Sequence, residues 1–345
     1  MKKALTVAAL IFALLLPLYL FSCTKAPIRA YHSRTFYDYF DTVGTFYDYK
    51  GLSDEEFDAL ADRVEEELSA YHKLYDIYNE YEGITNLATL NRTAGTGEVK
   101  VDERIIELLA LSKKLYDETG GEMNIAMGAV LSIWHDCREA ASADPTKARV
   151  PTLDELRAAA EHTKIEDIVI DEEKGTVELL DPKASLDVGA IAKGYAVEMA
   201  ANRVEKEYGG GFVLDVGGNL RTIGEKGDGT GWSAGIRNPN LASKKTIVYK
   251  TEIKNAALVT SGSYERYYTV DGVNYHHIIN SETLMPENYY ASVSVMTASS
   301  ALSDALSTAL FNMEYEDICD FVLSREGIFV VIVMTDGEVI TLGAI

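Results

Sequence analysis

The sequence has few cysteines, prolines and basic residues for its length. Of its 345 residues, 3 are Cys and 7 are Pro, and 32 Lys and Arg stand against 54 Asp and Glu. A chain of this length buries enough apolar surface to fold without disulfides, which excludes a small disulfide-stapled scaffold or a zinc finger. With 47% hydrophobic residues, the composition also argues against disorder, collagen and a coiled coil.

The charge balance restricts the kinds of partner. A formal net charge of −22 repels polyanions over the whole surface, so we expect no nucleic-acid partner. A small anionic ligand is compatible with this charge, because a metal ion or a helix N-terminus can reverse the local field inside a pocket.

The N-terminal residues have the pattern of an export signal. Lys2 and Lys3 precede an uncharged, mostly apolar run over residues 4–21, which ends at Ser22-Cys23. The pair Ser22-Cys23 resembles the lipobox of bacterial lipoproteins. We therefore expect an extracytoplasmic protein, anchored to the bacterial cell membrane by a lipid on Cys23. A plain transmembrane anchor is the alternative.

This pattern divides the chain into a signal peptide over residues 1–22, a tether over 23–35 and one domain over 36–345. The remaining thiols, Cys137 and Cys319, both lie in apolar stretches that look helical. We expect two buried single thiols, although an oxidising compartment would permit a disulfide. No spacing of Cys and His suggests a zinc site.

The first half of the domain has the signals of helices. Residues 53–56 form a capping box before apolar residues at helical spacing, a second helical pattern covers 102–121, and Thr152 with Glu155 caps a third. Before these helices, residues 36–49 alternate between apolar and polar, which predicts a strand.

From residue 165 onward the pattern is β-rich. Asp271-Gly272 and Asp336-Gly337 each lie between strand-like runs and predict hairpins. The expected strands cover 165–170, 176–180, 185–188, 212–216 and 232–236, and the expected helices cover 192–208, 298–312 and 316–324. We therefore predict an α+β fold with an antiparallel sheet, packed helices and a helix-rich N-terminal half.

Two segments have the pattern of a strand that leads into a turn. In residues 185–195, a strand is expected to end at Asp187, and Lys193 stands in the first turn of the next helix, where it opposes the helix dipole. A nearby anion such as a phosphate would account for this lysine, although an Asp N-cap with a solvated lysine is the alternative. In residues 212–219, a strand runs into Gly-Gly-Asn, which allows close backbone approach to a ligand but is a weak signal alone.

Two further segments carry side chains suited to catalysis or metal binding. His276 and His277 follow the predicted hairpin and point to opposite faces, so one of them at most faces a given pocket. Asp304 and Thr308 stand four residues apart on an Ala-rich helix, so both oxygens project from one face. Carboxylate and hydroxyl oxygens are suited to Mg²⁺, although a helix-surface Asp with a Thr bonded to its own backbone is the alternative.

Together these segments resemble the ApbE family of FAD:protein FMN transferases. The shared motifs are a Met-Gly-Thr-like start, Asp-x-Gly-Ala-x-Ala-Lys-Gly, Gly-Gly-Asn, Thr-Ser-Gly, His-Ile-Ile and Asp-Ala-x-x-Thr, spread from about residue 41 to 312. The resemblance implies a T-fold-related architecture, bound FAD, Mg²⁺, and transfer of FMN from FAD to a Thr hydroxyl of a target protein with release of AMP. It also implies an exported lipoprotein whose target is an exported redox subunit.

The resemblance also assigns roles to individual residues. It implies a Mg²⁺ ion held by the carbonyl of Ala190, the carboxylate of Asp304 and the hydroxyl of Thr308. His277 is then the candidate proton acceptor for the incoming hydroxyl. The positions that it places at FAD are Val43, Tyr78, Met123, Asn124, Ile125, Asp187, Lys193, His277 and Ile278.

Two segments depart from the family pattern. Met123-Asn124 stands where the family has Phe-Asp, so an amide replaces a carboxylate near the expected adenine or ribose. Residues 280–284 replace Asp-Pro-x-Thr-Gly, so the turn beside His277 loses its glycine. Because this turn is altered, an FAD pyrophosphatase activity, which uses water as the acceptor and yields FMN and AMP, is an alternative function. A flavin-binding lipoprotein without activity is a further alternative.

Overall fold

The computed structural model describes residues 30–345. The expected signal peptide and Cys23 lie outside these described residues. Strand β1 (His32–Tyr39) begins inside the expected tether, so the sheet starts earlier than the sequence pattern indicated. Within residues 30–345, no helix is both long enough and apolar enough to cross a membrane.

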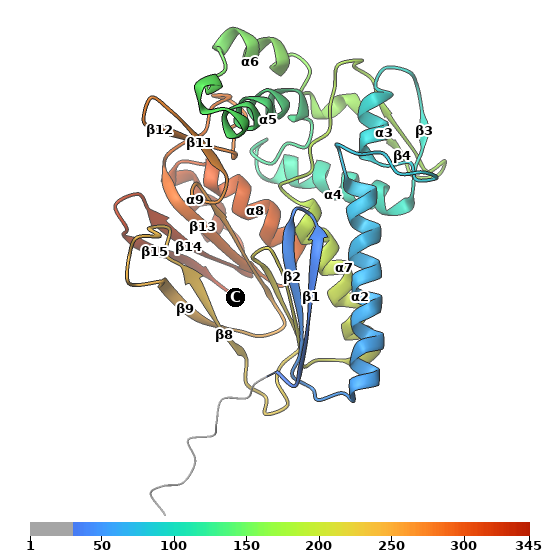
Figure 1. Ribbon diagram of the computed structural model, residues 1–345, viewed down its shortest axis with the longest axis vertical. Coiled ribbons are helices and arrows are strands. Elements are labelled where there is room, and N and C mark those ends of the chain that lie inside the picture. The colour runs from blue at the N-terminus through green and yellow to red at the C-terminus, as the bar shows by residue number, and fades with distance from the viewer. Residues whose placement is uncertain (1–29) are drawn as a thin grey trace, which may run out of the picture.

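The core contains an eight-stranded sheet in which all neighbouring strands are antiparallel (Figure 1). Their order across the sheet is β1, β2 (Thr42–Asp48), β6 (Phe212–Val216), β7 (Asn219–Ile223), β10 (Ala257–Gly262), β13 (Tyr290–Thr297), β14 (Ile328–Met334) and β15 (Val339–Ala344). This sheet confirms the predicted antiparallel α+β class.

Different elements cover the two faces of this sheet. Helices α7 (Ala192–Tyr208) and α8 (Ser300–Asn312) pack on one face, and α2 (Asp54–Tyr75) packs on α7. On the other face, the hairpin of β8 (Trp232–Arg237) and β9 (Ile247–Ile253) buries apolar side chains against the sheet. The helices that carry Lys193, Asp304 and Thr308 are therefore held in the core.

Most of the remaining elements form the upper part of Figure 1, whereas α9 packs against β14 and β15. The strands there make a three-stranded sheet in the order β3, β5, β4 and a separate hairpin of β11 and β12. The bounds are α3 (Leu87–Arg92), β3 (Val99–Lys100), α4 (Glu103–Glu118), α5 (Gly128–Ala143), α6 (Leu153–Ala160), β4 (Ile168–Asp171), β5 (Thr176–Leu179), β11 (Tyr267–Val270), β12 (Val273–His276) and α9 (Tyr315–Leu323).

The local signals in the sequence predicted most of these boundaries. The capping boxes at Ser53 and Thr152 are formed, and Asp102 caps α4. Both Asp-Gly turns close antiparallel hairpins. The thiols of Cys137 and Cys319 are free, with Cys137 buried and Cys319 only partly buried, so the expectation of two buried thiols is correct for the first alone.

Three strand predictions need correction. Residues 165–167 form a 3₁₀ helix, and β4 begins only at Ile168. Residues 36–49 form two strands with a turn at Phe40-Asp41, where φ is 54° and 52°, and no Gly or Asn marks this turn in the sequence. Residues 185–188 form no strand, apart from a single bridge from Ser185 to Met127. Their backbone is held by a side chain instead, because Leu186 N donates to Asn91 Oδ1 at 2.7 Å and Asn91 Nδ2 donates to Leu186 O at 3.0 Å.

Candidate functional site

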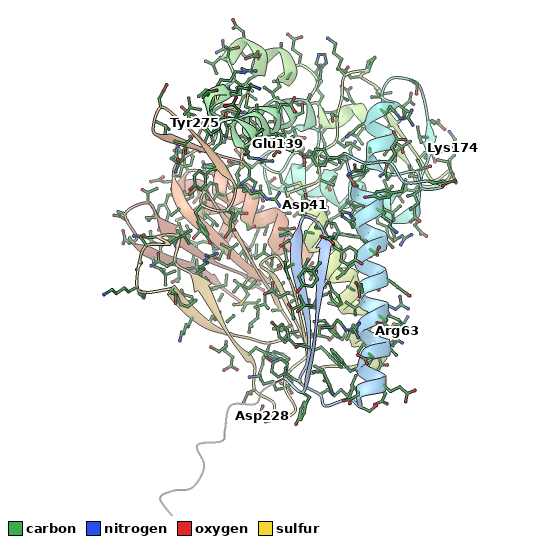
Figure 2. The ribbon with its side chains drawn as sticks, in the orientation of Figure 1. Asp41, Arg63, Glu139, Lys174, Asp228 and Tyr275 are labelled. Atoms are coloured by element: carbon green, nitrogen blue, oxygen red, sulfur yellow. The ribbon has the colours of Figure 1, made fainter. Side chains whose placement is uncertain are left out.

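A cavity of about 940 Å³ lies where the sheet, the helices and the β11–β12 hairpin meet. Its walls come from the tip of the β1–β2 hairpin, the loop before α7, the start of α5, the segment after β12 and one side of α8. Figure 2 labels two lining residues, Asp41 at the hairpin tip and Tyr275 on β12. This volume lies at the upper end of the range for small-molecule pockets, about 300–1,000 Å³.

The loop before α7 places Asp187, Ala190 and Lys193 in the cavity wall. Asp187 N donates to Ile125 O at 2.9 Å, and the Asp187 carboxylate accepts from Gly189 N at 2.9 Å. Burial raises the pKa of the Asp187 carboxyl above its ordinary range, and the hydrogen bond from Gly189 opposes this shift. Lys193 stands in the first turn of α7, as predicted, and lines the same cavity.

Asp304 is a buried carboxylate on α8 that also lines the cavity. Its Oδ2 accepts from Gly194 N at 2.7 Å. Burial raises the pKa of the Asp304 carboxyl, while the positive charge of Lys193 and the Gly194 N–H oppose the rise. Among residues 30–345, no basic side chain forms an ion pair with Asp304, so its charge lacks a direct partner.

Thr308 lies one turn after Asp304 on the same side of α8, as the spacing predicted, and it too lines the cavity. Its hydroxyl is 3.3 Å from Ser261 Oγ, and Ser261 Oγ is also 2.8 Å from Ser307 Oγ. Ser261 belongs to the Thr-Ser-Gly segment on β10. This hydroxyl chain fixes where the Thr308 oxygen lies.

The expected ligand set fits a hard divalent cation. A buried carboxylate without an ion-pair partner, a hydroxyl and the carbonyl-bearing Ala190 all line one cavity. Oxygen donors of this kind suit Mg²⁺, which keeps several positions for water and phosphate oxygens. Within the described part of the chain, no three His, Cys, Asp or Glu side chains form a metal-binding group.

His277 lines the cavity with one ring nitrogen already engaged. Its Nδ1 lies 3.2 Å from Arg266 O, and since a carbonyl only accepts, Nδ1 carries the proton. The other nitrogen, Nε2, is then unprotonated in the neutral ring. Burial and the nearby Arg266 charge lower the pKa of His277 to about 4, so the ring is neutral at pH 7.

His276 has no free ring nitrogen. Its Nε2 donates to Glu287 O at 2.7 Å, and its Nδ1 accepts from Ile278 N at 3.3 Å. The ring also packs edge-on against Phe311. These bonds give His276 a structural role. It nevertheless lines the same cavity as His277, so the expectation that at most one of the two histidines faces a given pocket was wrong: β12 ends at His276, and strand alternation does not extend to His277.

In the turn after His277, a leucine rather than a glycine adopts the left-handed backbone conformation. Leu284 has φ 61°, and its side chain is buried in a cluster with Trp134. Trp134 Nε1 donates to Leu284 O at 3.0 Å. Packing therefore holds a conformation that Gly would adopt without strain, and the turn is tied to α5.

The other residues placed at FAD by the resemblance divide into two groups. The first group lines the cavity and consists of Tyr78, Met123, Asn124 and Ile278. Of these, Tyr78 is 62% exposed, and its ring stacks on that of His135 with ring centres 5.1 Å apart. Val43 and Ile125 lie outside the cavity lining. Val43 points from β2 to solvent, and the Ile125 side chain is in the core while its carbonyl holds Asp187.

The amide of Asn124 is engaged by backbone at both ends. Its Nδ2 donates to Thr163 O at 3.1 Å, and its Oδ1 accepts from Ala126 N at 2.9 Å. An Asp could not make the first of these bonds. The departure from the family pattern at this position therefore has a structural role here.

Sequence reasoning missed several polar residues of the cavity. Asp215 is one, and burial raises the pKa of its carboxyl while Gly218 N and Lys193 oppose the shift. Glu122 is another, and burial together with nearby acids raises its pKa to about 7. The basic residues that were missed are Arg138, Arg237 and Arg266. Their segments carry no motif that would distinguish them from surface charges.

This geometry defines the class of protein. A cavity of about 940 Å³ with acidic and basic side chains on its walls, and an imidazole with one free nitrogen, is typical of an enzyme site. The ApbE family model matches residues 43–332, so the chain belongs to the ApbE family and is an enzyme of that family.

Named proteins and solved structures agree with this assignment. The chain is 28% identical over 284 residues to an FAD:protein FMN transferase of Klebsiella pneumoniae, covering 82% of this chain and 84% of the relative. It is 31% identical over 267 residues to one of Treponema pallidum, covering 73% and 72%. The crystal structure of an ApbE protein of Thermotoga maritima has a TM-score of 0.77 at 25% identity, with coverage of 90% and 96%.

Proposed function

We propose that this chain transfers FMN from FAD to a threonine hydroxyl of a target protein, with Mg²⁺ bound, and releases AMP. The observation that carries this proposal is that Asp304, Lys193 and His277 line one cavity large enough for a dinucleotide. The membership of the ApbE family and the relatives' name, FAD:protein FMN transferase, support the transfer of FMN from FAD to a protein.

The proposed cation ligands are Ala190, Asp304 and Thr308. These oxygens would hold a Mg²⁺ ion, which would supply positive charge to the pyrophosphate of FAD. Lys193, at the first turn of α7, contributes a second positive charge to the same phosphates. Lys193 and the α7 N-terminus thus favour binding of the FAD phosphates, although the protein as a whole has a strongly negative net charge.

His277 is the proposed base. Its Nε2 accepts the proton of the threonine hydroxyl while the threonine oxygen forms a bond to the FMN phosphorus. The bond between that phosphorus and the bridging oxygen breaks, and AMP leaves with the electron pair. Because Arg266 O holds Nδ1–H, the free lone pair is on Nε2 before the reaction begins.

The proposed target is an exported redox subunit, and the proposed location is outside the cytoplasm, with a lipid on Cys23. The support for both lies in the Ser22-Cys23 pattern and in the family resemblance, since residues 1–29 are outside the described part. Membrane fractionation and mass spectrometry of the N-terminus test the anchor. Cys23→Ala should give an uncleaved or released protein, and an unmodified Cys23 in a mature, membrane-bound chain would contradict the proposal.

The products formed from FAD test the reaction. With FAD, Mg²⁺ and a Thr-bearing acceptor protein, we expect acceptor with covalent flavin, together with AMP. Free FMN with AMP would instead identify an FAD pyrophosphatase. FAD that stays bound without AMP would identify a flavin-binding protein without activity.

A further inference from the structure

Asn219 is a core residue whose side chain is unpaired within residues 30–345. It is the first residue of β7, directly after Gly217-Gly218, and its exposed fraction is 0%. Neither its amide nitrogen nor its amide oxygen has a hydrogen-bond partner. Because a buried amide without partners lowers stability, its presence calls for a partner that the folded chain alone does not provide.

The register of β7 directs Asn219 toward the helices of the proposed cation site. Asn219 and Arg221 are two residues apart on a strand, so their side chains lie on the same face. Arg221 Nε donates to Glu198 Oε2 on α7 at 3.2 Å, and Ser300 N at the start of α8 donates to the same oxygen at 2.5 Å. This face of β7 therefore meets both α7 and α8.

Gly194 and Asp304 lie one helical turn from that ion pair. Gly194 is four residues before Glu198 on α7, and Asp304 is four residues after Ser300 on α8. The Asn219 amide is close enough to Asp304 to lower the pKa of its carboxyl, although it makes no hydrogen bond of normal geometry to it. The layer next to the cavity thus contains a buried carboxylate and an unpaired amide side by side.

We propose that Asn219 is a positioning residue of the cation site on Asp304: its buried amide would orient the carboxylate that would hold the cation. This inference rests on the proposed function, because it takes the cation to be Mg²⁺. Residues that orient a ligating carboxylate contribute strongly to metal affinity, and their loss typically costs about 10- to 100-fold.

Thermal unfolding of the full-length protein in detergent, titrated with MgCl2 alone and without FAD, tests this role. Asn219→Leu should raise the Tm without Mg²⁺, because it removes the unpaired amide, and should weaken the apparent Mg²⁺ affinity by about 10-fold or more. Asn219→Asp should lower the Tm without Mg²⁺, because two carboxylates then lie next to each other. Added Mg²⁺ should raise the Tm of this variant more than it raises that of the wild type.

Ser292→Ala is the matched control. Ser292 on β13 is also fully buried with an unpaired hydroxyl, but it is not among the groups that act on the Asp304 carboxyl. Its substitution should leave the Mg²⁺ affinity at the wild-type value.

A wild-type Mg²⁺ affinity in Asn219→Leu would overturn the role of Asn219 and leave the proposed Mg²⁺ site intact. If Asn219→Leu does not fold, a wild-type Mg²⁺ response in Asn219→Asp would overturn it. No Mg²⁺-dependent shift in the wild type would instead overturn the Mg²⁺ part of the proposed function and this inference with it.

Discussion

The backbone N–H of Gly194 donates to Asp304 Oδ2 at 2.7 Å, and no larger residue fits at position 194 without movement. A Cβ there would lie 2.4 Å from Asp304 Cβ and 2.4 Å from Ser300 O. The glycine therefore lets α7 and α8 approach until a backbone donor of one helix meets the carboxylate of the other. This contact fixes Asp304 relative to Lys193, which precedes Gly194.

Gly194→Ala should separate the two helices. We expect it to destabilise the protein by about 1–3 kcal/mol, because the added methyl group meets backbone and Cβ atoms that cannot rotate away. FMN transfer should fall as well, because the separation moves Asp304 away from Lys193. Gly227→Ala is the control, since a Cβ there meets nothing within 4 Å. Urea unfolding and a transfer assay measure the two effects, and equal behaviour of both variants would refute the proposed contact.

Asp304→Asn should remove the one formal negative charge that the proposed Mg²⁺ ligands supply. We expect loss of AMP production at low Mg²⁺, with partial recovery as Mg²⁺ is raised. Without metal, the variant should unfold at the wild-type temperature or higher, because burial already disfavours the charged carboxyl. Rates of AMP release across a Mg²⁺ titration test this, and wild-type Mg²⁺ dependence would remove Asp304 from the site.

His277→Ala should lower FMN transfer by about 10²- to 10⁴-fold, the usual value of a general base, with a smaller effect on FAD affinity. His276→Ala should lower the Tm more and transfer less, since it breaks bonds to the backbone of Glu287 and Ile278. Transfer rates and thermal unfolding of both variants decide the assignment. A larger loss of turnover in a folded His276→Ala would show that the two histidines have been assigned the wrong way round.

The lowered pKa of His277 also predicts a pH dependence of stability. The folded protein binds a proton at this ring only near pH 4, whereas the unfolded chain binds one near pH 6.5. The unfolded state therefore takes up more protons between these values, and stability falls as the pH drops from about 7 to 4. Because the ring is partly exposed, we expect a contribution of only about 1–2 kcal/mol. His277→Gln should reduce this loss in urea unfolding at pH 7.5 and 5, and an identical loss would contradict the lowered pKa of His277 in the folded protein.

The sequence was sufficient where a local signal determines the structure. The Asp-Gly pairs placed both hairpins, the capping residues placed the helix starts, and the four-residue spacing put Asp304 and Thr308 on one side of α8. In each case, the relevant contacts are close in the chain.

The sequence was insufficient where a distant side chain determines the backbone. Asn91 holds the loop at Leu186 across 95 positions, so a segment that looks like a strand becomes the loop that carries Asp187. The Phe40-Asp41 turn has no glycine to mark it, and it places Phe40 in the cavity wall and Val43 outside it. The unpaired amide of Asn219 depends on the register of β7 against two helices, which a weak Gly-Gly-Asn motif does not reveal.

The transfer reaction is tested most directly by measuring AMP and covalently bound flavin in the same sample. The purified chain is incubated with FAD, Mg²⁺ and an acceptor protein, and with the same acceptor after its threonine is replaced by valine. We predict about one AMP for each flavin attached to the threonine-bearing acceptor, as the proposed exchange of one phosphorus–oxygen bond for another requires, and neither product above background with the valine acceptor. AMP formed at the same rate with both acceptors, without covalent flavin, would contradict transfer to threonine and leave hydrolysis of FAD as the reaction.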